Sequence, residues 1–209
     1  MGGATLCAFF NGSAGGAGAG VYDATSPGTG SVTIPTGALG VTIEVWGAGG
    51  GGGKGGTYFI APGEPEVFEG GGGGGGGYSK TVLVLGVGDP TKTINYTVGT
   101  GGTGGTSGSP GTAGTFSNVF SGTYTITTMT ANGGSQGTST FAYTQGAGGT
   151  ASGGNTVPGT TGNGGALFTS DGAAGIVGDN SLTGGAGGDG GFTQGNDGQN
   201  GRVRMVFTF

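Results

Sequence analysis

The sequence lacks histidine altogether and has one cysteine among its 209 residues. Without histidine, any acid–base or metal chemistry would depend on carboxylates, and Cys7 has no partner for a disulfide within the chain. Charged residues are scarce, at 7%, and five Lys and Arg stand against ten Asp and Glu. A nucleic-acid-binding protein needs the opposite balance, because its cations neutralise the phosphates. We therefore expect a protein that is not an enzyme, has no cofactor and binds no nucleic acid.

Long hydrophobic runs are also missing. No stretch approaches the roughly 18 apolar residues that cross a membrane as a helix. The first 20 residues contain no basic residue and only the short apolar run Leu6–Phe10, which makes a poor signal peptide. We expect no membrane insertion, and a protein that is made in a host cytoplasm and carried outward as part of an assembly.

Glycine is abundant, with 63 residues, and much of it recurs at every third position. The longest such series is Gly99, Gly102, Gly105, Gly108, Gly111 and Gly114, and shorter ones follow between residues 159 and 201. A period of three matches polyproline II geometry, whereas seven prolines are too few for collagen. Flexible linkers are the alternative interpretation, but linkers have no reason to keep a triplet register. Because one such helix has no internal hydrogen bonds, we expect several to pack side by side, with 99–114 turning back at Ser109-Pro110.

Short segments with strand-like patterns alternate with these glycine runs, and Gly or Pro marks their junctions. The segments are Ser31–Pro35, Val41–Trp46, Lys80–Leu85, Thr93–Val98, Tyr124–Met129 and Arg202–Phe209. Their period-2 spacing predicts that one set of side chains is buried: Val41, Ile43, Val45, Ile94, Tyr96, Val203, Met205 and Phe207. No window has helical periodicity. We predict an all-β fold, a small antiparallel β-sandwich with packed polyglycine II (Gly-x-x) helices, over residues 25–209, preceded by an N-terminal attachment segment, residues 1–24.

The order of these elements resembles a known family. The string Ser31–Gly56 (SVTIPTGALGVTIEVWGAGGGGGKGG), then Gly70–Val84 (GGGGGGGGYSKTVLV), Asn95–Gly105 (NYTVGTGGTGG) and a closing strand after Gly184 are similar to the glycine-rich domain of bacteriophage tail fibre and tail-tip adhesin proteins. The resemblance spans roughly residues 25 to 209. It implies a β-sandwich base beside polyglycine II helices, whose loops contact host surface proteins or glycans. Residues 1–24 have no evident counterpart.

The resemblance leads to a functional prediction: a virion structural protein of a bacteriophage, a tail fibre or tail-tip component that contributes to host-surface attachment. Its partners would be other virion proteins and a host cell-surface protein or glycan, and self-association as a homo-oligomer is left open. One alternative is a capsid decoration or head-fibre protein without receptor binding. A less favoured one is an ice-binding protein, suggested by the spacing of Thr100, Thr103, Thr106 and Thr112.

Candidate site residues are aromatic or apolar residues that interrupt the glycine-rich sequence. Aromatic side chains on loops are typical anchors of binding surfaces, and the receptor-binding candidates are Tyr58, Phe59, Phe68, Phe141, Tyr143 and Phe168. Packing at an end of the sandwich or at a subunit interface is the alternative role for each. The virion-docking candidates are Leu6, Phe9 and Phe10. For metal we expect none, with Asp189 and Asp197 as weak calcium candidates because Gly184–Asp189 fits half of a β-roll repeat. The acidic cluster Glu64, Glu66 and Glu69 is interpreted as a solvated loop.

Overall fold

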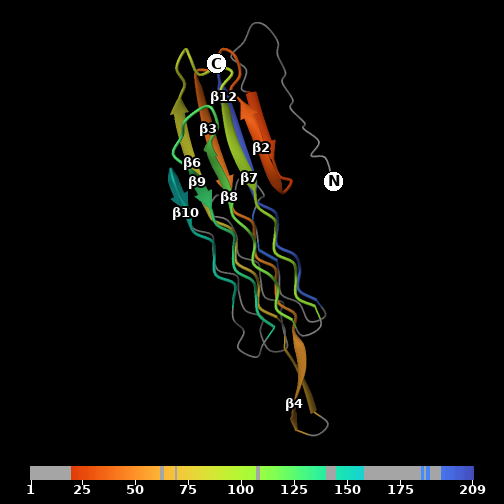
Figure 1. Ribbon diagram of the computed structural model, residues 1–209. Helices are drawn as coiled ribbons and strands as arrows, with labels where there is room; N and C mark the ends of the chain where they lie inside the picture. The colour runs from red at the N-terminus through yellow and green to blue at the C-terminus, as the bar shows by residue number, and fades with distance from the viewer. Residues whose placement is uncertain are drawn as a thin grey trace.

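The computed structural model describes residues 20–61, 64–68, 70–106, 109–139, 145–157, 185, 187–188 and 194–209. Within these residues the regular structure consists of strands and contains no helix, so the all-β prediction is confirmed. The strands are β1 (Gly20–Ala24), β2 (Gly28–Thr33), β3 (Gly40–Trp46), β4 (Gly56–Ala61), β5 (Glu64–Phe68), β6 (Tyr78–Val84), β7 (Thr93–Val98), β8 (Ser117–Ser121), β9 (Met129–Ala131), β10 (Ala151–Ser152), β11 (Asn155–Val157) and β12 (Arg202–Thr208). Figure 1 shows an elongated molecule with the sandwich at one end and the β4–β5 hairpin at the other.

Two antiparallel five-stranded sheets make the sandwich. One has the order β1-β12-β3-β6-β11 and the other β10-β9-β8-β7-β2, while β4 and β5 pair only with each other. β1 pairs along its whole length with β12, from Gly20 opposite Phe207 to Ala24 opposite Val203. Residues 20–24, which the sequence analysis placed in the attachment segment, are therefore an edge strand of the sandwich.

The hydrophobic core lies between the two sheets. Successive side chains of a strand point to opposite faces, so on β3 the residues Val41, Ile43 and Val45 face inward. The predicted core residues are all buried, with Tyr96, at 8% exposure, the most accessible of them. Val119, Met129 and Ala131 of the second sheet complete the cluster. Each buried aliphatic or aromatic side chain contributes about 1.5–3 kcal/mol relative to an exposed one, so side-chain burial holds this end together.

One predicted strand is wrong. Of Tyr124–Met129, only Met129 belongs to a strand, and β8, which was not predicted, lies before it. Residues 124–128 form a loop because their backbone groups find partners outside a ladder: the Tyr124 N–H donates to the Thr93 carbonyl at 3.0 Å, and the Ile126 N–H donates to Ser121 Oγ at 3.0 Å. Tyr124 and Ile126 still pack against the core, which explains the apolar pattern.

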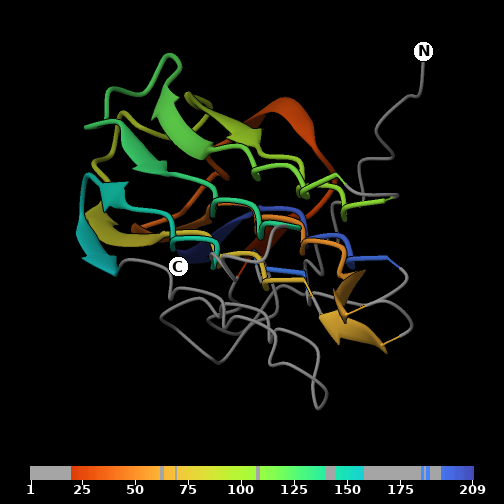
Figure 2. The same cartoon turned by 90° about the horizontal axis from the view of Figure 1, so that it is seen from below.

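The glycine-rich residues form extended segments that continue from the strands away from the sandwich (Figures 1 and 2). We name them segment I (47–54), II (70–77), III (99–106), IV (109–115), V (132–139), VI (145–150), VII (185–188) and VIII (194–201), of which residue 186 lies outside the description. Segments III and IV are joined by a turn in which the Ser109 N–H donates to the Thr106 carbonyl at 2.9 Å. The predicted reversal at Ser109-Pro110 is therefore confirmed.

Segment I lies at the centre of six others, and its backbone bonds follow a period of three. It donates from Gly47, Gly50 and Gly53 to segment II, from Ala48 and Gly51 to segment IV, and from Gly49 and Gly52 to segment VIII. Its carbonyls accept from Gly102 and Gly105 of segment III, from Gly134 and Gly137 of segment V, and from Gly188 of segment VII. Three donor directions alternate with three acceptor directions, as expected of a helix with three residues per turn.

The six outer segments also bond to one another and close a ring around segment I. The ring order is III, VIII, VII, II, V, IV and back to III, through bonds such as Gly198 to Gly102, Gly185 to Asn200, Gly73 to Gly188, Gly74 to Ser135, Gly114 to Gly134 and Thr112 to Thr103, with N···O distances of 2.8 to 2.9 Å. Segment VI lies outside the ring against II and V. This arrangement, the glycine bundle, is the predicted packing of polyglycine II helices, and its core is made of backbone.

Candidate interaction surfaces

The connections that the structure describes lie at two opposite ends of the molecule. Segments I and II are joined by the β4–β5 hairpin, III and IV by the turn at Thr106–Ser109, and V and VI through residues 140–144, which lie outside the described part. The hairpin and the turn leave the bundle at the end that faces away from the sandwich (Figure 1). We call this end the tip. The loops between β2 and β3 and between β6 and β7 lie at the opposite, outer end of the sandwich.

The tip contains the receptor-binding candidates that the structure describes. Tyr58 and Phe59 belong to β4 and Phe68 to β5, in a hairpin that pairs Tyr58 with Glu66 and has a register shift between Phe59 and Ala61. Their backbone is described and their side chains are not. The acidic stretch around Glu64 and Glu66 is thus part of a hairpin, which corrects the interpretation as a loop. Phe141, Tyr143 and Phe168 lie outside the described residues.

The outer end of the sandwich exposes apolar side chains. Leu39 is 65% exposed, Val84 88% and Val87 103%. The Leu39 N–H donates to Thr208 at 2.7 Å, and the Leu39 carbonyl accepts from Leu85 at 2.9 Å, so this loop is tied to the ends of β12 and β6. Gly20, the first described residue, also lies at this end, paired with Phe207. The docking candidates Leu6, Phe9 and Phe10 precede it and lie outside the described residues.

Side chains of two neighbouring segments cap the outward N–H groups of segment III. Thr115 Oγ1 accepts from Thr100 at 2.7 Å, and Thr112 Oγ1 accepts from Thr103 at 2.7 Å. On the other side, Asn200 Oδ1 accepts from Gly101 at 3.0 Å and Asp197 Oδ1 accepts from Gly104 at 2.7 Å. Thr112, Thr115 and the calcium candidate Asp197 therefore have a structural role, because they satisfy backbone donors that the ring leaves unpaired.

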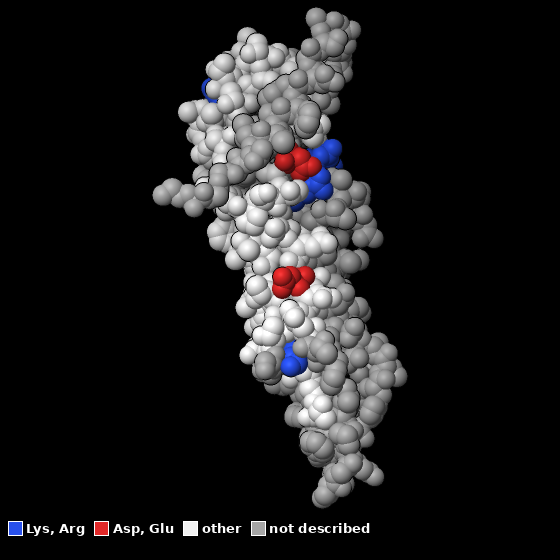
Figure 3. Space-filling view, turned by 90° about the vertical axis from the view of Figure 1, so that its right-hand side faces the viewer, with Lys and Arg blue, Asp and Glu red and all other residues white. Residues whose placement is uncertain are grey.

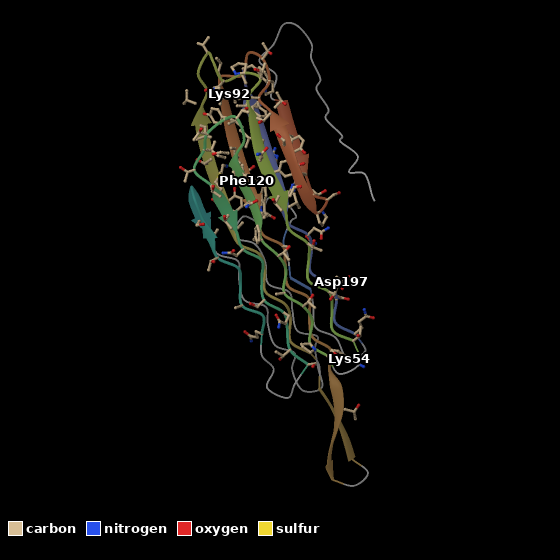
Figure 4. The ribbon with its side chains drawn as sticks, in the orientation of Figure 1. Lys54, Lys92, Phe120 and Asp197 are labelled. Atoms are coloured by element: carbon tan, nitrogen blue, oxygen red, sulfur yellow. The ribbon has the colours of Figure 1, made fainter. Side chains whose placement is uncertain are left out.

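Asp189, the other calcium candidate, lies outside the described residues. Within the described part of the chain, no group of three or more Cys, Asp or Glu side chains is placed to hold a metal ion. Figure 4 shows Asp197 partway along the bundle, Lys54 beside the base of the hairpin, Phe120 on the sandwich and Lys92 near its outer end. These labelled charges are well separated along the molecule, so they do not form one charged patch.

A polar network crosses the face of the first sheet that points away from the hydrophobic core between the sheets. Glu44 of β3 is 5% exposed and accepts from Tyr78 at 2.8 Å and from Arg204 at 3.0 Å, while Lys80 lies 3.6 Å away. Arg202 pairs with Asp23 of β1, and this hydrogen bond raises the pKa of Arg202. Because each charge faces an opposite charge on a neighbouring strand, the network ties β1, β12, β3 and β6 together.

A partly buried tyrosine pair and a buried indole occupy two further positions of the sandwich. Tyr22 and Tyr96 share a hydrogen bond between their hydroxyls, and burial together with this bond raises the pKa of Tyr22. Trp46 is fully buried beside Tyr78, with ring centroids 5.0 Å apart, and its Nε1 has no hydrogen-bond partner among the described residues. None of these residues was predicted as a site from the sequence, and the charges of Glu44, Lys80 and Arg204 on strands that pair in register are the signal that could have identified Glu44.

The molecular surface carries charge at only a few places. On the face in Figure 3, most described side chains are uncharged, with small acidic and basic groups separated along the length. In the described residues, no helix is long and apolar enough to span a lipid bilayer. On this face the described surface therefore lacks the strong electrostatic field that steers charged partners.

The comparison with protein families identifies the kind of domain. A family model described as a glycine-rich domain matches residues 23–206. The match begins within β1 and ends within β12, so it covers the sandwich, the bundle and the tip. The search of curated proteins finds no match.

Proposed function

The chain belongs to the glycine-rich domain family, and we propose that it is a structural protein of a bacteriophage particle, a tail fibre or tail-tip component that contributes to attachment to the host surface. Membership of the family establishes that the chain is a glycine-rich domain. The place in a particle and the contact with a host are the proposal.

The separation of the two ends supports this proposal. The tip contains the β4–β5 hairpin and the turn between segments III and IV, whereas the outer end carries Gly20 and the exposed apolar side chains Leu39, Val84 and Val87. Exposed apolar side chains near one another are typical of a docking surface. Loops on a rigid scaffold are typical of recognition. One end would join other virion proteins and the other would face a host protein or glycan.

The construction of the glycine bundle is compatible with separate roles for the two ends. Segment I bonds to its six neighbours through backbone groups alone, so the scaffold places few demands on the side chains of the tip. A connection such as Gly56–Phe68 can then vary in sequence while both of its ends stay anchored in segments I and II.

The test uses particles that carry the chain. Antibody labelling in electron microscopy should place the chain on the tail. The double substitution Phe141→Ala and Tyr143→Ala, and separately Tyr58→Ala with Phe59→Ala, should leave particle yield unchanged and slow adsorption to host cells. The matched control is Val82→Ala on the sandwich, a residue that is 68% exposed, which should change neither.

Two results would overturn the proposal. If the tip variants adsorb normally but fail to assemble, the tip is an assembly interface. Labelling on the capsid with normal adsorption of every variant would favour a capsid decoration or head-fibre protein.

A further inference from the structure

Around the ring of six segments, each pair of neighbours leaves a position where one more helix can lie. The position between segments II and V is occupied by segment VI. There Gly146 and Gly149 donate to the carbonyls of Gly72 and Gly75, at 2.9 and 2.8 Å, and the N–H groups of Asn132 and Ser135 donate to Thr150 and Ala147, each at 2.8 Å. Segment VI shows which backbone groups such a position offers and what fills it.

Two further positions are closed by side chains. Between segments III and IV, Thr112 and Thr115 accept from the outward N–H groups of segment III. Between segments III and VIII, Asp197 and Asn200 do the same. Capping of this kind resembles the ways in which proteins protect the edges of β-sheets from unwanted pairing.

The position between segments IV and V is different, and we call it the open position. Segment V sends the N–H groups of Asn132 and Ser135 to segment VI and those of Gly134 and Gly137 to segment I. By the same period of three, Gly133 and Gln136 point in the remaining donor direction. Gly133 lies against segment IV, because a Cβ added to it would come within 2.2 Å of the Gly114 carbonyl oxygen.

The open position offers the same groups as the occupied one. Among the described residues, the N–H groups of Gly133 and Gln136 have no acceptor, and the carbonyls of Gly111 and Gly114 have no donor. One segment thus presents donors and its neighbour presents acceptors, as segments V and II do toward segment VI. No described side chain caps these donors.

An occupant needs glycine at every third residue. In segment VI, a Cβ added to Gly146 would lie 2.2 Å from the Ser135 carbonyl oxygen, and one added to Gly149 would lie 2.1 Å from that of Asn132. The chain contains another run with this register ahead of β1, at Gly12, Gly15 and Gly18. We propose that the open position binds residues Gly12–Gly18 of a second copy of this chain as an additional polyglycine II helix.

The same copy cannot supply this run. Gly20 pairs with Phe207, six residues beyond Gly201, where segment VIII meets β12, and six strand residues span about 20 Å. Gly133 lies beside Gly114, which in turn packs on Ala48, beyond the end of β3. Gly18 and Gly15 are two and five residues from Gly20 and reach at most about 7 and 18 Å from it, so two of the three glycines of the run cannot arrive at the open position. The run must therefore come from another copy, in a head-to-tail contact that joins two different surfaces and builds a chain or ring of copies.

The test follows self-association of the full chain by sedimentation velocity over a concentration series. Gly15→Val with Gly18→Val breaks the glycine register of the donor run, and Ala14→Val with Ala17→Val is the matched control outside the register. Gln136→Pro closes the open position, because proline suits extended geometry but removes the N–H and fills its place. Ala113→Pro, at an exposed residue of segment IV, is its control.

We expect the unmodified chain and both controls to associate, and both test variants to associate at least about tenfold more weakly. Mixing the two test variants should restore a one-to-one complex, since one keeps the open position and the other keeps the donor run. The proposal does not depend on host attachment, and adsorption assays leave it untouched. It is overturned if the unmodified chain stays monomeric at millimolar concentration, or if either test variant associates as tightly as its control.

Discussion

The sandwich and the glycine bundle are two ends of one chain that are stabilised in opposite ways. In the sandwich, side chains such as Ile43 and Met205 fill the space between the sheets and are completely buried. In the bundle, Gly50, Gly51 and their neighbours bring backbones together so closely that a single added carbon has no room. The sandwich therefore depends on the shape of its side chains, whereas the bundle depends on their absence. Folding of the bundle costs conformational entropy, because glycine loses the most backbone freedom on folding. The many backbone hydrogen bonds between its segments offset this cost.

The sharpest way to break this comparison is to add a side chain to the bundle. A Cβ at Gly187 would lie 2.1 Å from the Gly73 carbonyl oxygen, and the nearby atoms are backbone that cannot rotate away. We expect Gly187→Val to lower the free energy of unfolding by more than about 4 kcal/mol, measured by thermal or urea unfolding. Gly88→Val is the control, because a Cβ at Gly88 has nothing within 4 Å. Equal melting temperatures for the two variants would contradict packing by backbone contact.

A deletion in the sandwich should have a large but smaller effect. Ile43 is fully buried between the sheets, and removing a buried aliphatic side chain costs about 2–5 kcal/mol through lost contacts and the cavity that remains. We expect this loss for Ile43→Ala and almost none for Val82→Ala, on the neighbouring strand but 68% exposed. Fluorescence of Trp46, which is the last residue of β3 before segment I, follows both unfolding reactions. A loss below about 1 kcal/mol for Ile43→Ala would mean that the bundle alone supports the fold.

The two regions also differ in how far the sequence predicts them. Alternation on β3, β7 and β12 predicted which side chains are buried, because each strand has one apolar face. Short strands are harder to predict from the sequence. β8 has one fully buried apolar residue, Val119, and the predicted strand at Tyr124–Met129 became a loop whose apolar side chains still reach the core.

For the bundle, the triplet register predicted the kind of helix but not its neighbours. Segments I and II have almost the same sequence, yet one is central and the other lies in the ring. Glycine has no side chain to distinguish partners, so the order of the strands sets the lattice. Asp197 and Asn200 show the same limit, since nothing in the sequence indicates that their side chains cap Gly104 and Gly101, which are more than 90 residues away.

Removing one such cap should have a moderate effect. Asp197→Ala leaves the Gly104 N–H without its acceptor at 2.7 Å, and we expect a loss of about 1 kcal/mol in the free energy of unfolding. Asp197→Asn keeps an Oδ1 acceptor and should lose less than half as much. Hydrogen exchange at the Gly104 amide gives a local measure and should speed up in the alanine variant only. Exchange at the Gly104 amide that is equally slow in the alanine variant and in the unmodified chain would show that the cap contributes nothing to the bundle.

The smallest effect is expected at a surface turn of the sandwich, where a charge is exposed. The Asp89 carboxylate accepts from Lys92 Nζ at 2.9 Å and from the Gly86 N–H at 2.7 Å, and these two bonds, the first above all, lower the pKa of Asp89. A carboxyl whose folded pKa is lowered stabilises the fold above its unfolded pKa, which is near 3.8, and this contribution is lost as pH falls through the folded pKa. Asp89→Asn should therefore lower the melting temperature by at most about 2 °C at pH 7. The difference from the unmodified chain should shrink toward zero as pH falls below the folded pKa, because both side chains are then neutral. A difference that stayed constant with pH would show that the charge of Asp89 is not what stabilises the turn.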